Sequence, residues 1–174
     1  MEKSLIIYAS VDGQTRKICE HIQTTLLTEK QRVELISITD FNKNLADYGK
    51  IIIASSIRYG KHNQDIEKLI DENYELLNRK KSVFISVNLV ARKPEKSQAH
   101  SNPYVVKFLN KIKWKPTATE VFAGKLNYKI YNFLDRQLIR LIMLITKGPT
   151  NSKTEIEYTN WQKVTDFARR FAKM

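Results

Sequence analysis

Short apolar runs alternate with longer segments of helical period along most of the chain, and this alternation is the feature that most constrains the fold. Five runs rich in β-branched and aromatic residues predict strands at residues 5–9, 33–38, 50–54, 83–87 and 120–123. Apolar residues at three- or four-residue spacing predict helices at residues 15–29, 63–77, 103–112, 129–147 and 160–172. This order indicates an α/β protein with a doubly wound, five-stranded parallel sheet that helices cover on both faces.

The chain is long enough for one domain with a substantial core, since it has 174 residues of which 42% are apolar. We interpret residues 1–174 as a single domain, because no internal repeat, linker or low-complexity stretch divides them. A single cysteine, Cys19, excludes a disulfide framework and indicates a reducing compartment. The three histidines share no ligand spacing, so we expect no metal.

Positive charge is concentrated in one part of the sequence. The formal net charge is +12, but residues 79–153 contain 16 Lys and Arg against three Asp and Glu, whereas the other 99 residues contain 14 against 15. Such segregation more often marks an anionic partner than general solubility. A nucleic-acid-binding module is one possibility, but the chain lacks the basic sheet with interleaved aromatics or the reading helix of such modules, so we expect no nucleic acid.

The loop after the first expected strand is the first candidate binding site. In open α/β sheets, ligands bind beyond the carboxyl ends of the strands, and here the chain reads SVDGQT at residues 10–15 before a helix. Hydroxyl side chains, a glycine and the free N–H groups of a helix N-terminus are suited to hold a phosphate. The alternative is an ordinary turn in which Ser10 or Thr15 caps the helix.

Two more loops are expected at the same edge of the sheet. Residues 55–60, SSIRYG, follow the third strand, and the ring of Tyr59 is suited to lie against a flat cofactor, although a plain surface tyrosine is the simpler interpretation. Residues 88–94, NLVARKP, follow the fourth strand. Because parallel strands end at one edge, we expect the three loops to converge.

These loops resemble a known family. The sequences DGQT at 12–15, SIRYG at 56–60 and SVNLVARKPEK at 86–96 closely resemble the bacterial flavodoxin-like protoporphyrinogen IX dehydrogenases that use quinones. Ser10, the run LIM at 141–143, and Tyr158, Thr159 and Trp161 extend the resemblance over nearly the whole chain.

The resemblance implies a flavodoxin-like fold, FMN as cofactor and a place in haem biosynthesis. It implies an oxidoreductase that removes six electrons from protoporphyrinogen IX in three steps and passes them to menaquinone or ubiquinone. No catalytic triad or carboxylate pair is recognisable, which agrees with chemistry carried by a flavin. The implied location is peripheral, on the cytoplasmic side of the bacterial inner membrane, whose anionic surface is a further expected partner.

We expect the three loops and one glycine after the fifth strand to hold FMN. The expected cofactor-binding residues are Ser10, Val11, Asp12, Gly13, Gln14, Thr15, Ser56, Ile57, Tyr59, Gly60, Ser86, Val87, Asn88, Leu89 and Gly124. Asp12 replaces the hydroxyl residue usual in flavodoxins, so it should weaken FMN binding or serve as a local cap. The loop after the fourth strand lacks a second aromatic, which predicts one open flavin face. His62, just past the second loop, is a minor candidate for substrate contact.

Residues 129–147 are expected to form an extra basic, amphipathic helix after the fifth strand. At 100° per residue, its four cations share a narrow stripe, and apolar residues cover about half of the wheel. Cations near an anionic bilayer, where quinone is dissolved, would support peripheral binding. The alternative is an ordinary surface helix with its apolar side in the core. The expected contacts to substrate or membrane are Arg92, Lys93, Lys129, Arg136, Arg140 and Lys147.

A flavodoxin-like electron carrier or NAD(P)H:quinone reductase is the alternative function on the same fold. The basic segment argues against it, because electron-carrier flavodoxins are typically acidic. Yellow colour on addition of FMN would separate either flavoprotein from a nucleic-acid-binding module.

Overall fold

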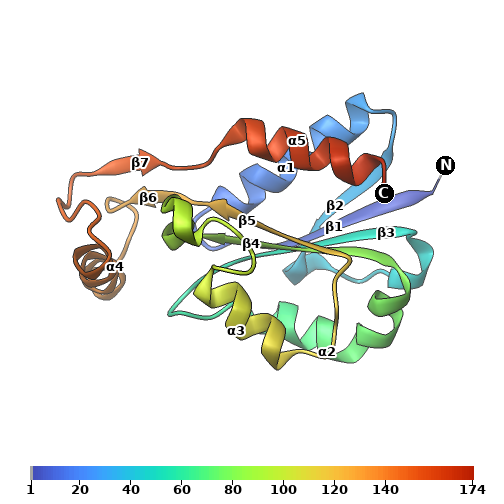
Figure 1. The fold of residues 1–174 in the computed structure, drawn as a ribbon, viewed down its shortest axis with the longest axis horizontal. Helices are drawn as coiled ribbons and strands as arrows, with labels where there is room; N and C mark the ends of the chain where they lie inside the picture. Colours follow the sequence, from blue (N-terminus) through green and yellow to red (C-terminus); the bar gives the residue numbers. More distant parts are fainter. Residues whose placement is uncertain (1) are drawn as a thin grey trace.

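The computed structural model describes residues 2–174 and confirms the predicted five-stranded sheet (Figure 1). All neighbouring strands are parallel, in the doubly wound order β2-β1-β3-β4-β5. The strands are β1 (Lys3–Ala9), β2 (Arg32–Ser37), β3 (Lys50–Ser56), β4 (Lys81–Asn88) and β5 (Ala118–Ala123). Their bounds differ from the predicted ones by at most two residues.

Helices cover both faces of the sheet, as predicted. Helices α1 (Gln14–Thr28) and α5 (Trp161–Ala172) lie on one face, and α2 (Gln64–Arg79) and α3 (Pro103–Lys111) lie on the other (Figure 1). Four short 3-10 helices complete the connections: η1 (Ile38–Asp40), η2 (Leu45–Asp47), η3 (Leu89–Arg92) and η4 (Pro94–Lys96).

The core consists of two layers, one on each side of the sheet. Successive residues of a strand point to opposite faces, so Ile6 packs with α1 and α5, whereas Leu5 and Ile7 pack with α2 and α3. All three side chains are fully buried. The strands are therefore continuously apolar, as expected where both faces of a parallel sheet are covered.

Three elements lie beyond the sheet. Helix α4 (Phe133–Ile145) and the antiparallel strands β6 (Lys125–Asn127) and β7 (Glu155–Glu157) stand at one end of the molecule, opposite the start of β1 and the end of α5 (Figure 1). The sequence did not predict β6 and β7, because three residues are too few to show a period of two.

Helix α4 is shorter than the predicted helix at 129–147. It begins after Asn132, whose side-chain oxygen accepts the N–H of Asp135 at 2.8 Å. It ends where Lys147 takes a left-handed φ of 55°, and the N–H groups of Lys147 and Gly148 return to the carbonyls of Leu144 and Met143. This is a Schellman ending, so Lys147 lies outside the helix.

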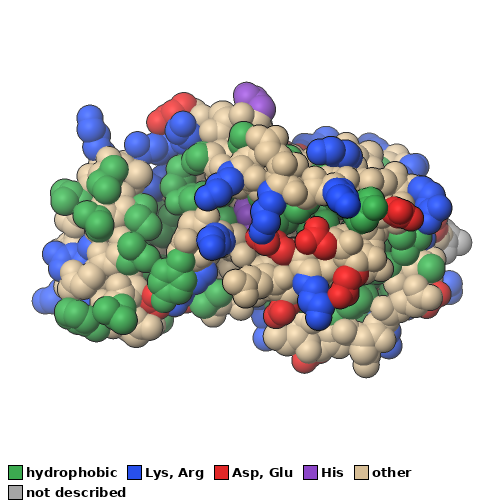
Figure 2. Space-filling model, turned by 90° about the horizontal axis from the view of Figure 1, so that it is seen from below, with side chains coloured by type: hydrophobic (Ala, Val, Ile, Leu, Met, Phe, Trp, Pro, Cys, Tyr) green, Lys and Arg blue, Asp and Glu red, His purple; other side chains and the backbone are tan. Residues whose placement is uncertain are grey.

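Most apolar residues of α4 do not face the core, so the helix departs from the ordinary surface-helix alternative. Met143 is fully buried and packs with Leu126, Tyr128 and Tyr131. The opposite arc is exposed: Phe133 71%, Leu134 75%, Leu141 54%, Leu144 67% and Ile145 72%. Figure 2 shows hydrophobic side chains gathered at this end of the molecule. Within residues 2–174, no helix is long and apolar enough to cross a membrane.

Candidate cofactor and substrate site

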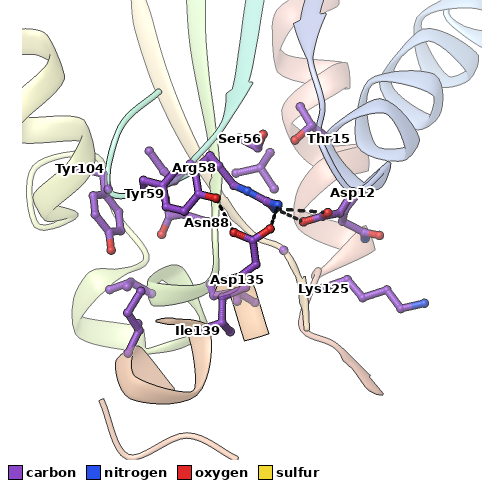
Figure 3. Close-up of a pocket in the computed structure, with 18 of the residues that line it drawn as sticks. Asp12, Thr15, Ser56, Arg58, Tyr59, Asn88, Tyr104, Lys125, Asp135 and Ile139 are labelled. Carbon is purple, nitrogen blue, oxygen red and sulfur yellow. Dashed lines mark hydrogen bonds and ion pairs between the residues drawn. The ribbon is translucent and has the colours of Figure 1, made fainter. Parts of the chain in front are cut away.

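A cavity lies at the carboxyl edge of the sheet, where the loops after β1, β3 and β4 meet (Figure 3). The cavity is open to solvent, and the space in it that a water-sized sphere can occupy is about 120 Å³. Leu138, Ile139 and Ile142 of α4 contribute an apolar wall. The predicted convergence of the three loops is confirmed, and the extra helix borders the same cavity.

Most of the predicted cofactor-binding residues line this cavity. These are Ser10, Asp12, Gln14, Thr15, Ser56, Ile57, Tyr59, Gly60, Val87, Asn88, Leu89 and Gly124. Val11, Gly13 and Ser86 are not among its lining residues. Gly13 is the N-cap of α1, and Ser86 lies beneath the cavity, where its hydroxyl binds Asn88. Contact of Val11, Gly13 and Ser86 with a cofactor stays a prediction.

The N-terminus of α1 opens onto this site without a side-chain cap. Gly13 stands at the N-cap position with φ 87°, and neither Ser10 nor Thr15 of the described chain caps the helix, so that alternative is wrong. The other α-helices each begin with an asparagine that accepts a backbone N–H: Asn63, Asn102, Asn132 and Asn160. A Cβ built on Gly13 would meet no atom within 4 Å. The first N–H groups of α1 thus face open space.

The hydroxyl of Ser10 is a second group suited to bind a ligand oxygen. Among the described residues, its Oγ is buried and has no hydrogen-bond partner. Leaving a buried hydroxyl unpaired costs about 1–3 kcal/mol, so such groups are retained where a ligand or water satisfies them. Ser10 Oγ and the uncapped α1 together fit an anionic, oxygen-rich group such as a phosphate.

Four side chains form a charged cluster at the rim of the cavity (Figure 3). The Arg58 guanidinium lies between two carboxylates: it pairs with Asp135 of α4 and reaches Asp12 at 3.3 Å. The Tyr59 hydroxyl donates to Asp135 at 2.6 Å. Asp12 therefore pairs with Arg58 and does not cap α1, which corrects its predicted role as a local cap.

Burial and hydrogen bonding shift several pKa values at this rim. Partial burial raises the pKa of Asp12, with Arg58 opposing the shift. The hydrogen bond to Asp135 raises the pKa of Tyr59, because ionising the phenol would remove the donor. Burial raises the pKa of Tyr104 and Tyr131, which also line the cavity. All three phenols are thus neutral donors at pH 7.

The rim loop after β3 closes in a strained turn. Arg58 and Lys61 exchange two backbone hydrogen bonds of 2.9 and 3.0 Å, and the residues between them have positive φ, 51° at Tyr59 and 75° at Gly60. This is the geometry of a type I′ turn, in which a tyrosine is unusual. Tyr104 of α3 adds an aromatic side chain beside this loop, and the open flavin face stays a prediction.

A buried polar network supports the floor of the cavity. His62 is 4% exposed and its Nε2 lies 2.9 Å from Ser86 Oγ, which also accepts from Asn88 Nδ2 at 3.1 Å. Asn88 in turn accepts from Asn102 at 3.1 Å. Burial lowers the pKa of His62 to about 3, so its ring is neutral. His62 is not a lining residue, and its place is beneath Asn88.

The cations predicted to meet substrate or membrane do not line the cavity, and two of them support the chain instead. Arg92 binds Leu89 O at 2.9 Å and the carbonyl and hydroxyl of Thr146 at 3.1 and 2.8 Å. Arg136 binds the carbonyls of Tyr128 and Tyr131, both at 3.1 Å. Lys129 lies 3.8 Å from Glu155, and Lys93, Arg140 and Lys147 stand elsewhere on the surface.

Sequence reasoning missed several lining residues, namely Arg58, Val90, Tyr104, Lys125, Tyr131, Asp135, Leu138, Ile139 and Ile142. Asp135 did carry a signal. It is the only acidic residue between Glu120 and Glu155, so it is the one local carboxylate with which the cations of this basic segment could pair.

The fold and the site define a protein of the flavodoxin class. A family model described as a flavodoxin domain matches residues 5–153. Oxidised Flavodoxin 1 from Bacillus cereus superimposes with a TM-score of 0.57 at 16% identity, over 98% of this chain and 97% of that one. Flavodoxin 2 of the same organism gives 0.57 at 19% identity, over 98% of both chains. These likenesses show the fold.

Curated relatives narrow the class to one family. The protoporphyrinogen IX dehydrogenase (quinone) of Leishmania major is 43% identical over 172 residues, which are 98% of this chain and 74% of that protein. The protein of the same name from Escherichia coli strain K12 is 36% identical over 171 residues, 98% of this chain and 94% of that one. The chain belongs to the protoporphyrinogen IX dehydrogenase (quinone) family, which confirms the resemblance seen in its loops.

Proposed function

We propose that this protein binds FMN and oxidises protoporphyrinogen IX, with menaquinone or ubiquinone as the acceptor, in haem biosynthesis. The observation that carries the proposal is the uncapped α1 N-terminus beside the unpartnered Ser10 hydroxyl, in a chain of this family. FMN, when bound, supplies the reversible electron acceptance that a porphyrinogen donor and a quinone acceptor both require. Six hydrogens leave the porphyrinogen in three steps, and three quinones become quinols.

The phosphate end of FMN is assigned to the loop after β1. The free N–H groups at the start of α1 and the hydroxyls of Ser10 and Thr15 would bind the phosphate oxygens. Asp12 would repel a phosphate, but Arg58 lies beside its carboxylate and offsets that charge. Arg58, which also pairs with Asp135, would therefore reduce the penalty that the sequence predicted for Asp12.

The ring end of FMN is assigned to the loops after β3 and β4. Tyr59 and Asn88 stand on this side of the cavity, and the network beneath Asn88 holds its amide in place. The wall formed by Leu138, Ile139 and Ile142 faces them. That wall would exclude water from the reacting atoms and offer an apolar surface to a flat tetrapyrrole or a quinone head.

An anaerobic assay tests the proposed reaction. FMN-loaded protein is mixed with protoporphyrinogen IX and a menaquinone analogue, and porphyrin fluorescence is followed. We expect fluorescence to rise only when protein, FMN and quinone are all present. A yellow holoprotein that forms no porphyrin but reduces quinone with NAD(P)H would overturn the proposal in favour of the quinone reductase alternative.

The same proposal includes peripheral binding to the anionic cytoplasmic face of the bacterial inner membrane, through α4. The exposed arc of α4 offers contiguous apolar side chains, and Lys129, Arg140 and Lys147 are exposed at the same end of the molecule. Apolar insertion combined with cations is the combination that holds peripheral helices on anionic bilayers. The quinone acceptor, which is dissolved in the bilayer, would then be close to the cavity bordered by α4.

A matched pair of leucines tests this surface. Leu141 on α4 and Leu27 on α1 are both 54% exposed, so Leu141→Gln and Leu27→Gln make the same chemical change at equal exposure. Cosedimentation with phosphatidylglycerol vesicles should show roughly fivefold weaker binding for Leu141→Gln, from about 1 kcal/mol of lost apolar contact. Leu27→Gln should bind as the wild type does. Equal binding by both variants would overturn membrane docking through α4.

A further inference from the structure

Helix α4 is joined to both loops that border the ring end of the cavity. Near its start, the Asp135 carboxylate accepts from Arg58 and Tyr59 of the loop after β3 (Figure 3). At its end, Thr146 accepts from Arg92 of η3, in the segment after β4. A displacement of α4 would therefore act on the loops assigned to the flavin ring.

Asp135 binds two side chains, Arg58 and Tyr59, that are themselves only partly packed against the protein. The side chain of Tyr59 is 64% exposed, and its backbone is left-handed with φ 51°, which is strained for a non-glycine residue. A hydrogen bond from its hydroxyl to Asp135 joins its side chain to α4. Arg58 is about one-third exposed, whereas Asp135 is 2% exposed. The buried carboxylate is thus the fixed point of the cluster.

We propose that Asp135 is a positioning residue that couples the seating of α4 on a membrane to the geometry of the cofactor site, through Tyr59 and Arg58. The inference rests on the proposed function, because it requires FMN at the cavity and a bilayer at the outer arc of α4. The inner side of α4 reaches the cofactor loops, and the outer side presents the exposed apolar residues. The two sites therefore share one rigid element, and Asp135 is where that element meets the loop after β3.

Coupling of this kind is reciprocal and can be measured without turnover. If membrane-bound α4 favours the loop geometry that binds FMN, then vesicles strengthen FMN binding by the same factor by which FMN strengthens vesicle binding. FMN titrations of the full-length apoprotein, with and without phosphatidylglycerol vesicles, give this factor as a ratio of two Kd values. We expect a ratio on the order of 5 for the wild type, typical of coupling between two sites.

The Asp135→Asn variant should reduce that ratio to about one. The amide keeps the shape of the carboxylate but removes the charge that holds Arg58, which can then move toward Asp12. Tyr59→Phe, which keeps the ring and removes only the phenol donor, should lower the ratio in part. Asp166→Asn on α5 is the control, because Asp166 is an exposed carboxylate whose hydrogen-bond partner is Gln162, far along the chain from α4.

The ratio distinguishes coupling from a merely structural role. A structural defect in Asp135→Asn would weaken FMN binding equally with and without vesicles and leave the ratio unchanged, which would overturn the inference. A ratio of one in the wild type would also overturn it. A wild type that binds neither FMN nor vesicles would instead refute the proposed function on which the inference rests.

Discussion

Helices α1 and α4 both border the cavity, but α1 has an uncapped N-terminus whereas α4 has an exposed apolar side. The inner side of α1 is complete, with Ile18, Ile22 and Leu26 fully buried, but its N-terminus has no side-chain cap. Helix α4 is capped by Asn132 and ended by a Schellman motif, but its outer arc is exposed.

The difference shows where each helix is left incomplete. A self-sufficient helix satisfies its terminal backbone groups and buries its apolar side. The N-terminal N–H groups of α1 have no side-chain cap, which indicates a ligand that binds N–H groups. The apolar side chains on the outer arc of α4 are exposed, which indicates a partner surface that accepts apolar groups. Departures from such rules tend to occur at functional sites. Here one departure exposes polar backbone groups and the other exposes apolar side chains.

The largest expected effect compares the same truncation on the two helices. Leu26→Ala removes a fully buried side chain of α1 and should cost about 2–5 kcal/mol of unfolding free energy. Leu144→Ala on α4, where the leucine is 67% exposed, should change it by less than about 0.5 kcal/mol. Urea denaturation of the two variants measures both values. Equal losses would mean that the outer arc of α4 is buried in solution, which would break the comparison.

Exchanging the N-cap residues of the two helices should affect ligand binding next most strongly. Gly13→Asn places a side chain at a left-handed φ of 87°, where it is strained, and fills the space in front of α1. We expect the apoprotein to lose about 1 kcal/mol of stability, while FMN affinity falls by about 1–3 kcal/mol as charge-assisted hydrogen bonds are lost. The measurements are thermal unfolding and flavin titration.

The reverse exchange is the control for that prediction. Asn132→Gly gives α4 the N-cap residue of α1 and should cost only a few tenths of a kcal/mol, because glycine is itself a tolerated N-cap. If Gly13→Asn left the FMN affinity unchanged, the proposal that the FMN phosphate binds at the start of α1 would be wrong.

A pH titration separates the two sides of the loop after β3, since Tyr59 faces α4 whereas His62 is buried in the core. Burial lowers the pKa of His62 to about 3, below its unfolded value near 6.5, so the unfolded chain binds the extra proton between these values. Stability contributed by the neutral ring is therefore complete above pH 6.5 and decreases as the pH falls. From pH 7 to 5 this loss should be about 2 kcal/mol.

His62→Gln is the matched variant for this titration, because it cannot take up the proton. Its unfolding free energy should be lower at pH 7 but should fall less between pH 7 and 5 than that of the wild type. Parallel curves for the two proteins would place His62 in a hydrated setting instead of beneath Asn88.

The sheet could be predicted from the sequence because its strands are buried on both faces and are therefore continuously apolar, as residues 50–54 illustrate. The orientation of α4 could not, since a helical period identifies opposite sides but not which side meets the protein. The cluster of Asp135 and Arg58 joins residues 77 positions apart, which no local pattern reports. The sequence predicts Arg92 and Arg136 as contacts to substrate or membrane, but both bind backbone carbonyls.

The two chain ends offer a practical handle on this molecule. The start of β1 and the end of α5 lie at the end opposite α4 (Figure 1), and α4 borders the cavity. A fluorescent protein or an immobilisation tag fused to either terminus would stand away from the exposed arc and from the mouth of the cavity. Tethered by its C-terminus to a sensor chip, the protein would present α4 outward, so that vesicles, flavin and quinone could be delivered in sequence to one and the same immobilised sample.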